Sequence, residues 1–133
     1  MGTVDFAGVS KTFGGKTVVR ALADVDLRVA DGEFVALLGP SGCGKSTLLN
    51  ILAGFERLTT GRVRFDGQTI SRPGPDRGVV FQEASLLPWL TVWDNVVFGP
   101  QVQGVARSIY EPKAQEILEI VGLEGFKRAS RSD

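Results

Sequence analysis

Alternating hydrophobic and polar positions dominate the start of the chain. Residues 4–9 are expected to form a first strand, which a pair of glycines separates from the next one. Residues 17–22 and 25–29 alternate apolar and polar side chains, as half-buried strands do. After an Asp-Gly turn, residues 34–38 are continuously apolar, which predicts a strand buried on both faces.

A helical pattern follows a glycine-rich segment. Residues 45–53 place Leu48, Leu49 and Leu52 on one side of a predicted helix, and Gly54 is its expected stop. Further along the chain, short strands are expected at residues 62–65 and 78–81, with an Asp-Gly turn and a Pro-Gly-Pro loop between them.

The last third of the chain carries helix signals. Thr91 and Asp94 have the spacing of a capping box, which predicts a helix starting near Val92. Ser108 and Glu111 repeat that spacing before a second helix, which is expected to end at Gly122. The apolar face of this second helix is expected to consist of Ala114, Ile117, Leu118 and Val121.

Composition excludes several classes of protein. The 133 residues are 43% hydrophobic, with 15 basic and 15 acidic side chains, so neither disorder nor a dedicated nucleic-acid surface is expected. One cysteine excludes an intrachain disulfide framework, and the absence of histidine excludes histidine chemistry. The apolar runs are shorter than the about 18 residues that span a bilayer, so a cytosolic or peripheral protein is expected.

One loop carries recognisable chemistry. It matches G-x-x-x-x-G-K-[ST], and its residues are Gly39, Pro40, Ser41, Gly42, Cys43, Gly44, Lys45 and Ser46. Glycines allow successive N–H groups to turn inward around an anion, and the following helix adds its positive end. Lys45 would contact the β- and γ-phosphates, Ser46 a magnesium ion and Thr47 the α-phosphate. The pattern therefore predicts binding of a nucleoside triphosphate.

An accidental glycine-rich turn is the alternative interpretation. The context argues against it, because the loop follows a predicted buried strand and opens an amphipathic helix. The motif requires no particular side chain at Cys43. We favour the interpretation that this cysteine is a small space-filling residue over the interpretation that it is a redox switch.

The motif and its surroundings resemble the ATP-binding cassette (ABC) transporter ATPases. The match begins with Gly-Pro-Ser-Gly-Cys-Gly-Lys-Ser-Thr and continues with Leu-Leu-Asn-Ile-Leu-Ala-Gly at residues 48–54. Residues 78–82, Gly-Val-Val-Phe-Gln, resemble the family's glutamine loop. Residues 86–89 and 91–96 look like the branch that imports taurine, alkanesulfonates and nitrate, and residues 76–82 and 121–125 are most similar to its taurine importers. The resemblance implies an α/β P-loop NTPase fold: an antiparallel β-subdomain, a phosphate-loop strand–helix unit and the start of a helical subdomain.

The resemblance implies roles for two further residues. Phe13 occupies the place of an aromatic that stacks on adenine, and packing within the β-subdomain is an equal alternative. Gln82 corresponds to the glutamine that senses Mg²⁺ and the γ-phosphate. The alternative is that Gln82 is a surface residue at the end of a strand. Lys45 and Gln82 are thus the implied catalytic residues, and Ser46 and Gln82 the implied metal ligands. The implied cofactors are ATP and Mg²⁺.

The resemblance also implies partners. A predicted apolar loop would face the coupling helix of a transmembrane permease, and local core packing is the alternative; its residues are Leu86, Leu87, Pro88 and Trp89. A second ATPase subunit would complete a homodimer, a solute-binding protein would act indirectly, and the assembly would lie at the cytoplasmic face of the membrane. No nucleic-acid partner is expected.

Several family features are missing from the sequence. There is no Ser-Gly-Gly, no run of four apolar residues followed by Asp-Glu, and no histidine. Residues 1–126 are therefore expected to be a partial ATP-binding domain, and residues 127–133 a divergent polar tail. We expect a marginally folded chain with weak or no turnover.

Three functions remain open at this point. The first is the ATP-binding subunit of an importer for a small anion or sulfonate, and the second is a non-catalytic fragment that binds nucleotide or the membrane subunit. The third, a P-loop kinase or GTPase, is disfavoured because no Asn-Lys-x-Asp motif occurs.

Overall fold

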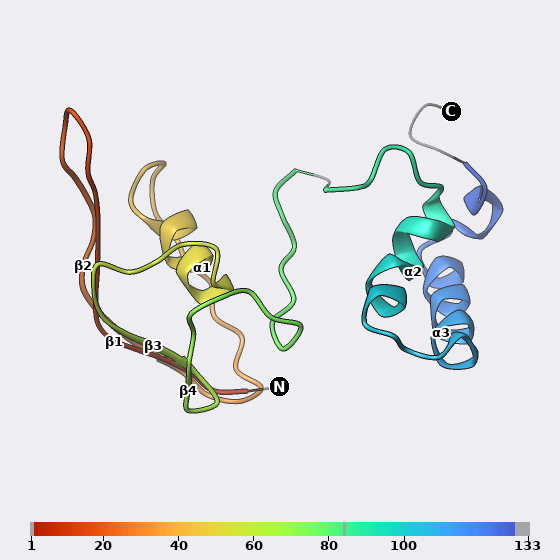
Figure 1. The fold of residues 1–133 in the computed structure, drawn as a ribbon, viewed down its shortest axis with the longest axis horizontal. Helices are drawn as coiled ribbons and strands as arrows, with labels where there is room; N and C mark the ends of the chain where they lie inside the picture. Colours follow the sequence, from red (N-terminus) through yellow and green to blue (C-terminus); the bar gives the residue numbers. More distant parts are fainter. Residues whose placement is uncertain (1, 84, 130–133) are drawn as a thin grey trace. The chain divides into compact units, whose positions relative to one another are not determined.

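The computed structural model describes residues 2–83 and 85–129. The chain divides into two compact units, Met1–Val80 and Phe81–Asp133, and each is described by itself (Figure 1).

The first unit is an antiparallel sheet with one helix. Its strands are arranged in the order β2-β1-β3-β4. The elements are β1 (Val4–Phe13), β2 (Val19–Val29), α1 (Lys45–Ala53), β3 (Thr60–Phe65) and β4 (Gln68–Thr69).

One face of this sheet forms the core with α1. Phe6 on β1 lies opposite Leu27 on β2 and Val63 on β3. Because side chains alternate along a strand, the neighbouring Asp5 points to the other face, where Arg28 and Arg64 are its cross-strand partners. The buried core cluster consists of Phe6, Val9, Leu22, Leu48, Ile51 and Val63. These contacts pack α1 against the sheet, whose strands lie before and after the helix in the sequence.

Local turn chemistry agrees with the sequence. Asp66 and Gly67 both have positive φ values, 47° and 75°, as a tight two-residue hairpin between β3 and β4 requires. The expected helix at residues 45–53 is confirmed, and Gly54 ends it in the left-handed conformation at φ 83°. The first strand is also confirmed, although β1 continues to Phe13.

Two features of the expected pattern need correction. Residues 17–22 and 25–29 belong largely to one continuous strand, β2, in which Asp24 takes a φ of 46° instead of ending the strand. Asp24 accepts a hydrogen bond from the hydroxyl of Ser10 at 3.2 Å, so the partner strand holds the irregular position. On α1 the buried side chains are Leu48, Ile51 and Ala53, whereas Leu49, which the pattern placed on the same side as Leu48, is exposed.

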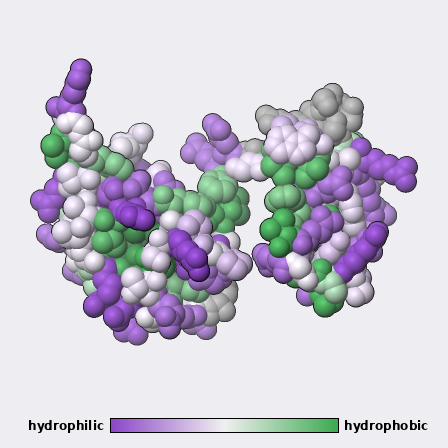
Figure 2. Space-filling view, in the orientation of Figure 1, coloured by the Kyte–Doolittle hydropathy of each residue, from purple (hydrophilic) through white to green (hydrophobic). Residues whose placement is uncertain are grey.

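The strands expected at residues 34–38 and 78–81 are wrong. Both segments are irregular, and neither pairs with a described strand. Phe34 is 93% exposed and Val80 is fully exposed. A central strand needs hydrogen-bonding neighbours and covered faces, and the described part of the chain supplies neither to these segments. Apolar side chains are accordingly visible at the surface in Figure 2.

The second unit is helical. It contains α2 (Val92–Val102), α3 (Arg107–Ile120) and the short 3-10 helix η1 (Glu124–Phe126). Its buried side chains are Val97 on α2 and Ala114 and Leu118 on α3. None of the helices in the described residues is both long enough and apolar enough to cross a bilayer.

The two expected capping boxes have different outcomes. Thr91 caps α2, because its hydroxyl accepts a hydrogen bond from the N–H of Asp94 at 3.1 Å, as expected. The box expected at Ser108 and Glu111 is wrong. There, α3 already begins at Arg107, and Glu111 instead accepts a hydrogen bond from the Arg107 guanidinium at 2.6 Å.

The expected apolar face of α3 is only half buried. Ala114 and Leu118 are in the core, whereas Ile117 and Val121 are exposed. Within the second unit α3 packs against α2 and η1. These two elements cover only part of the apolar face of α3, so some of its apolar side chains stay exposed.

Candidate functional site

The glycine-rich segment between residues 39 and 46 turns back on itself before α1. Gly42 and Gly44 have φ values of 79° and 98°, a region in which side chains with a Cβ are strained. The helix begins directly afterwards, at Lys45. We call residues 39–46 the phosphate loop. Left-handed glycines followed directly by a helix start are features of an anion-binding nest, as the motif predicts.

Gly44 also allows this loop to pack closely against the sheet. A Cβ placed on Gly44 would lie 2.6 Å from the carbonyl oxygen of Ala21 and 2.9 Å from a methyl carbon of Leu22. Both residues lie on β2. Glycine is therefore needed twice at this position, for the positive φ and for the close approach to the strand.

The ammonium of Lys45 lies over the phosphate loop. Its Nζ donates hydrogen bonds of 2.6 Å to the carbonyl oxygens of Gly39 and Pro40, and Cys43 Sγ lies 3.3 Å away. These acceptors are neutral, and no carboxylate in the described chain pairs with Lys45. The charge is thus held in the loop by weak acceptors that an anion could replace.

The start of α1 supplies further donors. The first backbone hydrogen bond of the helix runs from the N–H of Leu48 to the carbonyl of Gly44 at 2.9 Å. The N–H groups of Lys45, Ser46 and Thr47 precede it and have no acceptor within the helix. No side chain caps this end. The amides and the helix dipole are therefore directed toward the loop that Lys45 covers.

Cys43 is an exposed free thiol in the middle of the phosphate loop. A Cβ on Gly39 would lie 2.6 Å from its sulfur, so the side chain folds back toward the start of the loop. This contact agrees with the filler role favoured by the sequence.

Phe13 lies at the end of β1, opposite Val19 on β2. Val19 is two residues from Ala21, which contacts Gly44, so one strand connects the aromatic ring to the phosphate loop. The ring is 40% exposed, and the Nζ of Lys11 lies 4.6 Å from its centroid. Phe13 is therefore partly packed and partly accessible, which is compatible with stacking on adenine and with packing within the β-subdomain.

Lys11 is itself fixed by an ion pair. Its Nζ lies 2.7 Å from the carboxylate of Glu56 and donates to the carbonyl of Arg57 at the same distance. The hydrogen bond from Lys11 lowers the pKa of Glu56 below its ordinary value. The Lys11 ammonium beside Phe13 is thus held by Glu56 and Arg57, which follow α1 in the sequence.

Gln82 lies in the second unit, while the phosphate loop lies in the first. It is exposed and follows the irregular segment 78–81. Its approach to Ser46 and a bound metal remains a prediction. Within the described residues, no group of three acidic or cysteine side chains forms a ready-made metal site.

The apolar loop at residues 86–90, which we call the leucine loop, borders a groove in the second unit. The groove has a volume of about 430 Å³, and its lining residues are Leu86, Leu87, Leu90, Val92, Asn95, Val96, Leu123 and Ala129. Trp89 is 75% exposed and Pro88 is exposed, whereas Leu87 is half-buried. Sequence analysis did not single out Asn95, and its only signal was a polar residue within an apolar stretch.

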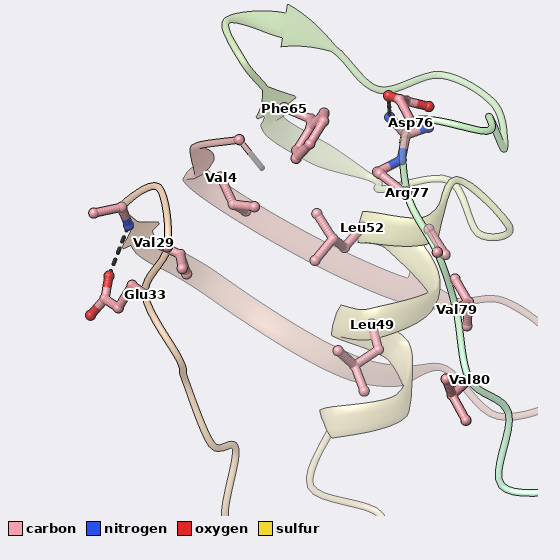
Figure 3. A pocket seen from close by; sticks show the side chains of 15 residues that line it. Val4, Val29, Glu33, Leu49, Leu52, Phe65, Asp76, Arg77, Val79 and Val80 are labelled. Carbon is pink, nitrogen blue, oxygen red and sulfur yellow. Dashed lines mark hydrogen bonds and ion pairs between the residues drawn. The ribbon is translucent and has the colours of Figure 1, made fainter. Parts of the chain in front are cut away.

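A larger cavity of about 450 Å³ lies in the first unit, away from the phosphate loop. Leu49 and Leu52 extend into it from α1, and Val79 and Val80 border it from the segment after β4 (Figure 3). None of its lining residues belongs to residues 39–46. It is an uncovered apolar face of the helix and not part of the candidate nucleotide site.

Comparison with known proteins identifies the family. The ABC transporter family model matches residues 22–132, which is most of the chain. The chain belongs to the ABC transporter family. The resemblance deduced from the phosphate loop and the glutamine-loop segment is therefore confirmed.

Named ABC relatives cover most of this chain. The taurine import ATP-binding protein TauB of Burkholderia pseudomallei is 52% identical over 108 residues, 81% of this chain and 42% of that protein. TauB of Pseudomonas aeruginosa is 49% identical over 109 residues, 82% of this chain and 41% of that protein. The chain thus spans about 42% of the length of the relatives it matches.

Solved ABC structures confirm the fold class. The dimeric post-hydrolysis state of the ATP-binding cassette MJ0796 bound to ADP and Pi has a TM-score of 0.79 and 32% identity. The alignment covers 97% of this chain and 62% of that one. The chain has the α/β fold of the N-terminal portion of an ABC ATPase, as expected.

Proposed function

We propose that this chain provides the ATP-binding part of an ABC importer subunit that couples ATP binding and hydrolysis to solute uptake. The observation that carries the proposal is the phosphate loop with Lys45 over it. Two left-handed glycines, three helix-start amides and an ammonium held by neutral carbonyls converge there. This set of groups suits a polyphosphate, which is highly charged and needs many donors at short range.

Each residue of the loop has a definite part in the proposal. The β- and γ-phosphates would take the place of the Gly39 and Pro40 carbonyls as partners of Lys45. The N–H groups at the start of α1 would donate to the phosphates, and Thr47 would contact the α-phosphate. Phe13 would stack on the adenine, with Lys11 over the ring.

The proposal includes a Mg²⁺ ion with two ligands from this chain. Ser46 lies in the first turn of α1 and would offer its hydroxyl, and Gln82 would offer its amide oxygen. Because no ready-made acidic cluster exists within the described residues, the ATP phosphates would supply the remaining oxygens. A bound Mg²⁺ would neutralise charge on the β- and γ-phosphates.

The proposed solute is a small sulfonate or related anion such as taurine, an alkanesulfonate or nitrate. The support for it is that relatives around half identical to this chain are named taurine import ATP-binding proteins. The leucine loop would contact a transmembrane permease at the cytoplasmic face, and a second ATPase subunit and a solute-binding protein would complete the importer. Residues 1–126 would form the partial cassette, with residues 127–133 as a divergent tail.

A titration of the chain with Mg-ATP by calorimetry tests this proposal. Lys45→Ala should weaken ATP binding by roughly 1.5 to 3 kcal/mol, because it removes a charge-assisted contact. Lys113→Ala removes an exposed lysine on α3 and is the matched control. Equal ATP affinity in Lys45→Ala and wild type would place the nucleotide elsewhere.

A second candidate is a module that binds nucleotide without hydrolysing it. Its basis in the sequence is that these 133 residues contain no apolar run ending in Asp-Glu, a pair that would hold magnesium and polarise the attacking water. Phosphate release separates the two functions. ATP binding with no release supports the module, and steady release that Lys45→Ala abolishes supports the enzyme.

A further inference from the structure

The side chain of Asn95 joins the leucine loop to α2. Asn95 lies in the first turn of that helix. Its Oδ1 accepts a hydrogen bond of 2.8 Å from the N–H of Leu87. Its Nδ2 donates to three carbonyl oxygens, those of Leu87 at 3.2 Å, Leu90 at 3.3 Å and Thr91 at 2.9 Å. One partly buried amide therefore holds the loop from its middle to its end.

These contacts fix the course of the loop backbone. Asn95 pairs with both the N–H and the carbonyl of Leu87, as a neighbouring strand would. The N–H of Leu90 also donates to the carbonyl of Leu87 at 3.0 Å, which closes the turn between them. The leucines of the loop are thus placed relative to α2 by backbone bonds as well as by apolar contacts.

The start of α2 does not need Asn95 for its own capping. The Thr91 hydroxyl accepts a hydrogen bond from the N–H of Asp94. The N–H groups of Val92 and Trp93 donate to the carbonyls of Ala129 at 2.9 Å and Lys127 at 3.1 Å. Since these first donors are already satisfied, the Asn95 amide serves the loop and not the helix end.

The groove beside the loop suits an apolar occupant. Among its described lining residues, Asn95 has the only polar side chain, and both ends of its amide are engaged with the loop backbone. The remaining lining side chains are aliphatic, the exposed Leu86 among them, and Trp89 of the same loop is also exposed. A polar segment would lose its water contacts there without gaining partners.

We propose that Asn95 is the positioning residue of this docking surface: it holds the leucine loop in the shape that accepts an apolar helix of the permease. The inference rests on the proposed function, which assigns the leucine loop to permease contact. It adds the residue that keeps the surface formed and the chemistry of the helix that fits it.

Asn95→Asp is the main variant in the full chain. A carboxylate keeps the size of the side chain and can still accept from Leu87, but it cannot donate, and it would face three carbonyl oxygens. The helix itself should tolerate it, because negative charge in a first turn is favourable. Asn50→Asp introduces the same change at an exposed position of α1 and is the matched control.

Loop order gives the first readout. Exchange of the Leu90 amide hydrogen should become about tenfold faster in Asn95→Asp, the effect of losing one net hydrogen bond. In a Trp93→Phe background Trp89 is the only tryptophan, and its fluorescence anisotropy should fall. Acidification that protonates the introduced carboxyl should partly restore the Trp89 anisotropy and bring the Leu90 exchange rate closer to that of wild type at the same pH, because one donor returns.

A second variant covers the case in which Asn95→Asp loses helix content by circular dichroism. Asn95→Ala removes all four bonds without adding charge and favours helix. It should loosen the loop equally at every pH. Wild-type exchange at Leu90 and wild-type Trp89 anisotropy in both variants would overturn the proposal.

Docking gives the second readout. The probes are a short amphipathic helical peptide with Leu and Phe on one face and a matched peptide with Ser at those positions. Wild type and Asn50→Asp should prefer the Leu/Phe peptide, and Asn95→Asp should lose about tenfold of that preference, the effect of one net hydrogen bond.

The two ideas can fail separately. No preference in wild type would reject the leucine loop as a docking surface and with it the inference. A preference that Asn95→Asp retains in full would leave the surface standing and reject the positioning role of Asn95.

Discussion

Gly44 of the phosphate loop packs against Ala21 of β2 so closely that a Cβ on the glycine would lie 2.6 Å from the Ala21 carbonyl oxygen. The contact joins the loop to the sheet at a residue that also has a φ of 98°. Gly44→Ala should therefore destabilise the first unit by about 1 to 3 kcal/mol from backbone strain alone. Urea unfolding measures the change.

Gly78→Ala is the control for that substitution. A Cβ added to Gly78 would meet no atom within 4 Å, and the backbone of Gly78 is not in the positive-φ region. This variant should unfold within about 0.5 kcal/mol of wild type. Equal unfolding midpoints for the Gly44 and Gly78 variants would show that the loop does not need its contact with β2.

Phe13→Ala tests whether the aromatic ring stacks on adenine. Loss of stacking should weaken ATP binding by about 1 to 3 kcal/mol while leaving inorganic tripolyphosphate binding unchanged. Val18→Ala, at an exposed position beyond the end of β1, is the control. If ATP and tripolyphosphate weaken together, Phe13 supports the fold of the hairpin and not the base.

Cys43 offers a chemical probe of the phosphate loop. Its thiol is exposed and lies 3.3 Å from Lys45 Nζ, so an alkylating reagent should react there and block the path of the phosphates. Bound ATP should slow the labelling, measured by intact mass. Cys43→Ser provides a complete blank because the chain has one cysteine. Labelling at the same rate with and without saturating ATP would contradict the proposed site.

The pair of Lys11 and Glu56 predicts a pH-dependent stability. Lys11 lowers the folded-state pKa of Glu56 below 4.5, so the pair stabilises the fold above the ordinary carboxyl pKa. This contribution is lost as the pH falls through the lowered value. Glu56→Gln should therefore unfold at lower urea than wild type at pH 7, and the two should converge under strongly acidic conditions. A constant difference at all pH values would assign the effect to packing.

The exposed apolar segments of the first unit predict weak stability and self-association. Phe34 and Val80 are almost fully exposed, and replacing both with Lys should reduce association in light scattering while changing stability by no more than about 0.5 kcal/mol each. The unmodified chain should show a broad thermal transition. A sharp, cooperative transition with normal heat capacity would contradict this expectation.

The sequence by itself determined the features that depend on neighbouring residues. The phosphate loop, α1 with its stop at Gly54, the Asp66-Gly67 turn and the Thr91 cap all follow from local backbone preferences and short-range hydrogen bonds. The family could be deduced for the same reason, because its specific signal combines two continuous segments, the phosphate loop and the glutamine-loop segment at residues 78–82.

Tertiary structure alone decided whether an apolar run becomes a strand and which helix face is covered. Residues 34–38 have the composition of a buried strand, yet no described strand pairs with them, so they stay irregular and largely exposed. Ile51 is buried and Leu49 is not, because the sheet meets only one side of α1. Asn95 gained its role in the same way, from carbonyls that only the folded loop brings within reach. Strand pairing, burial and such bonds depend on partners that local sequence does not specify.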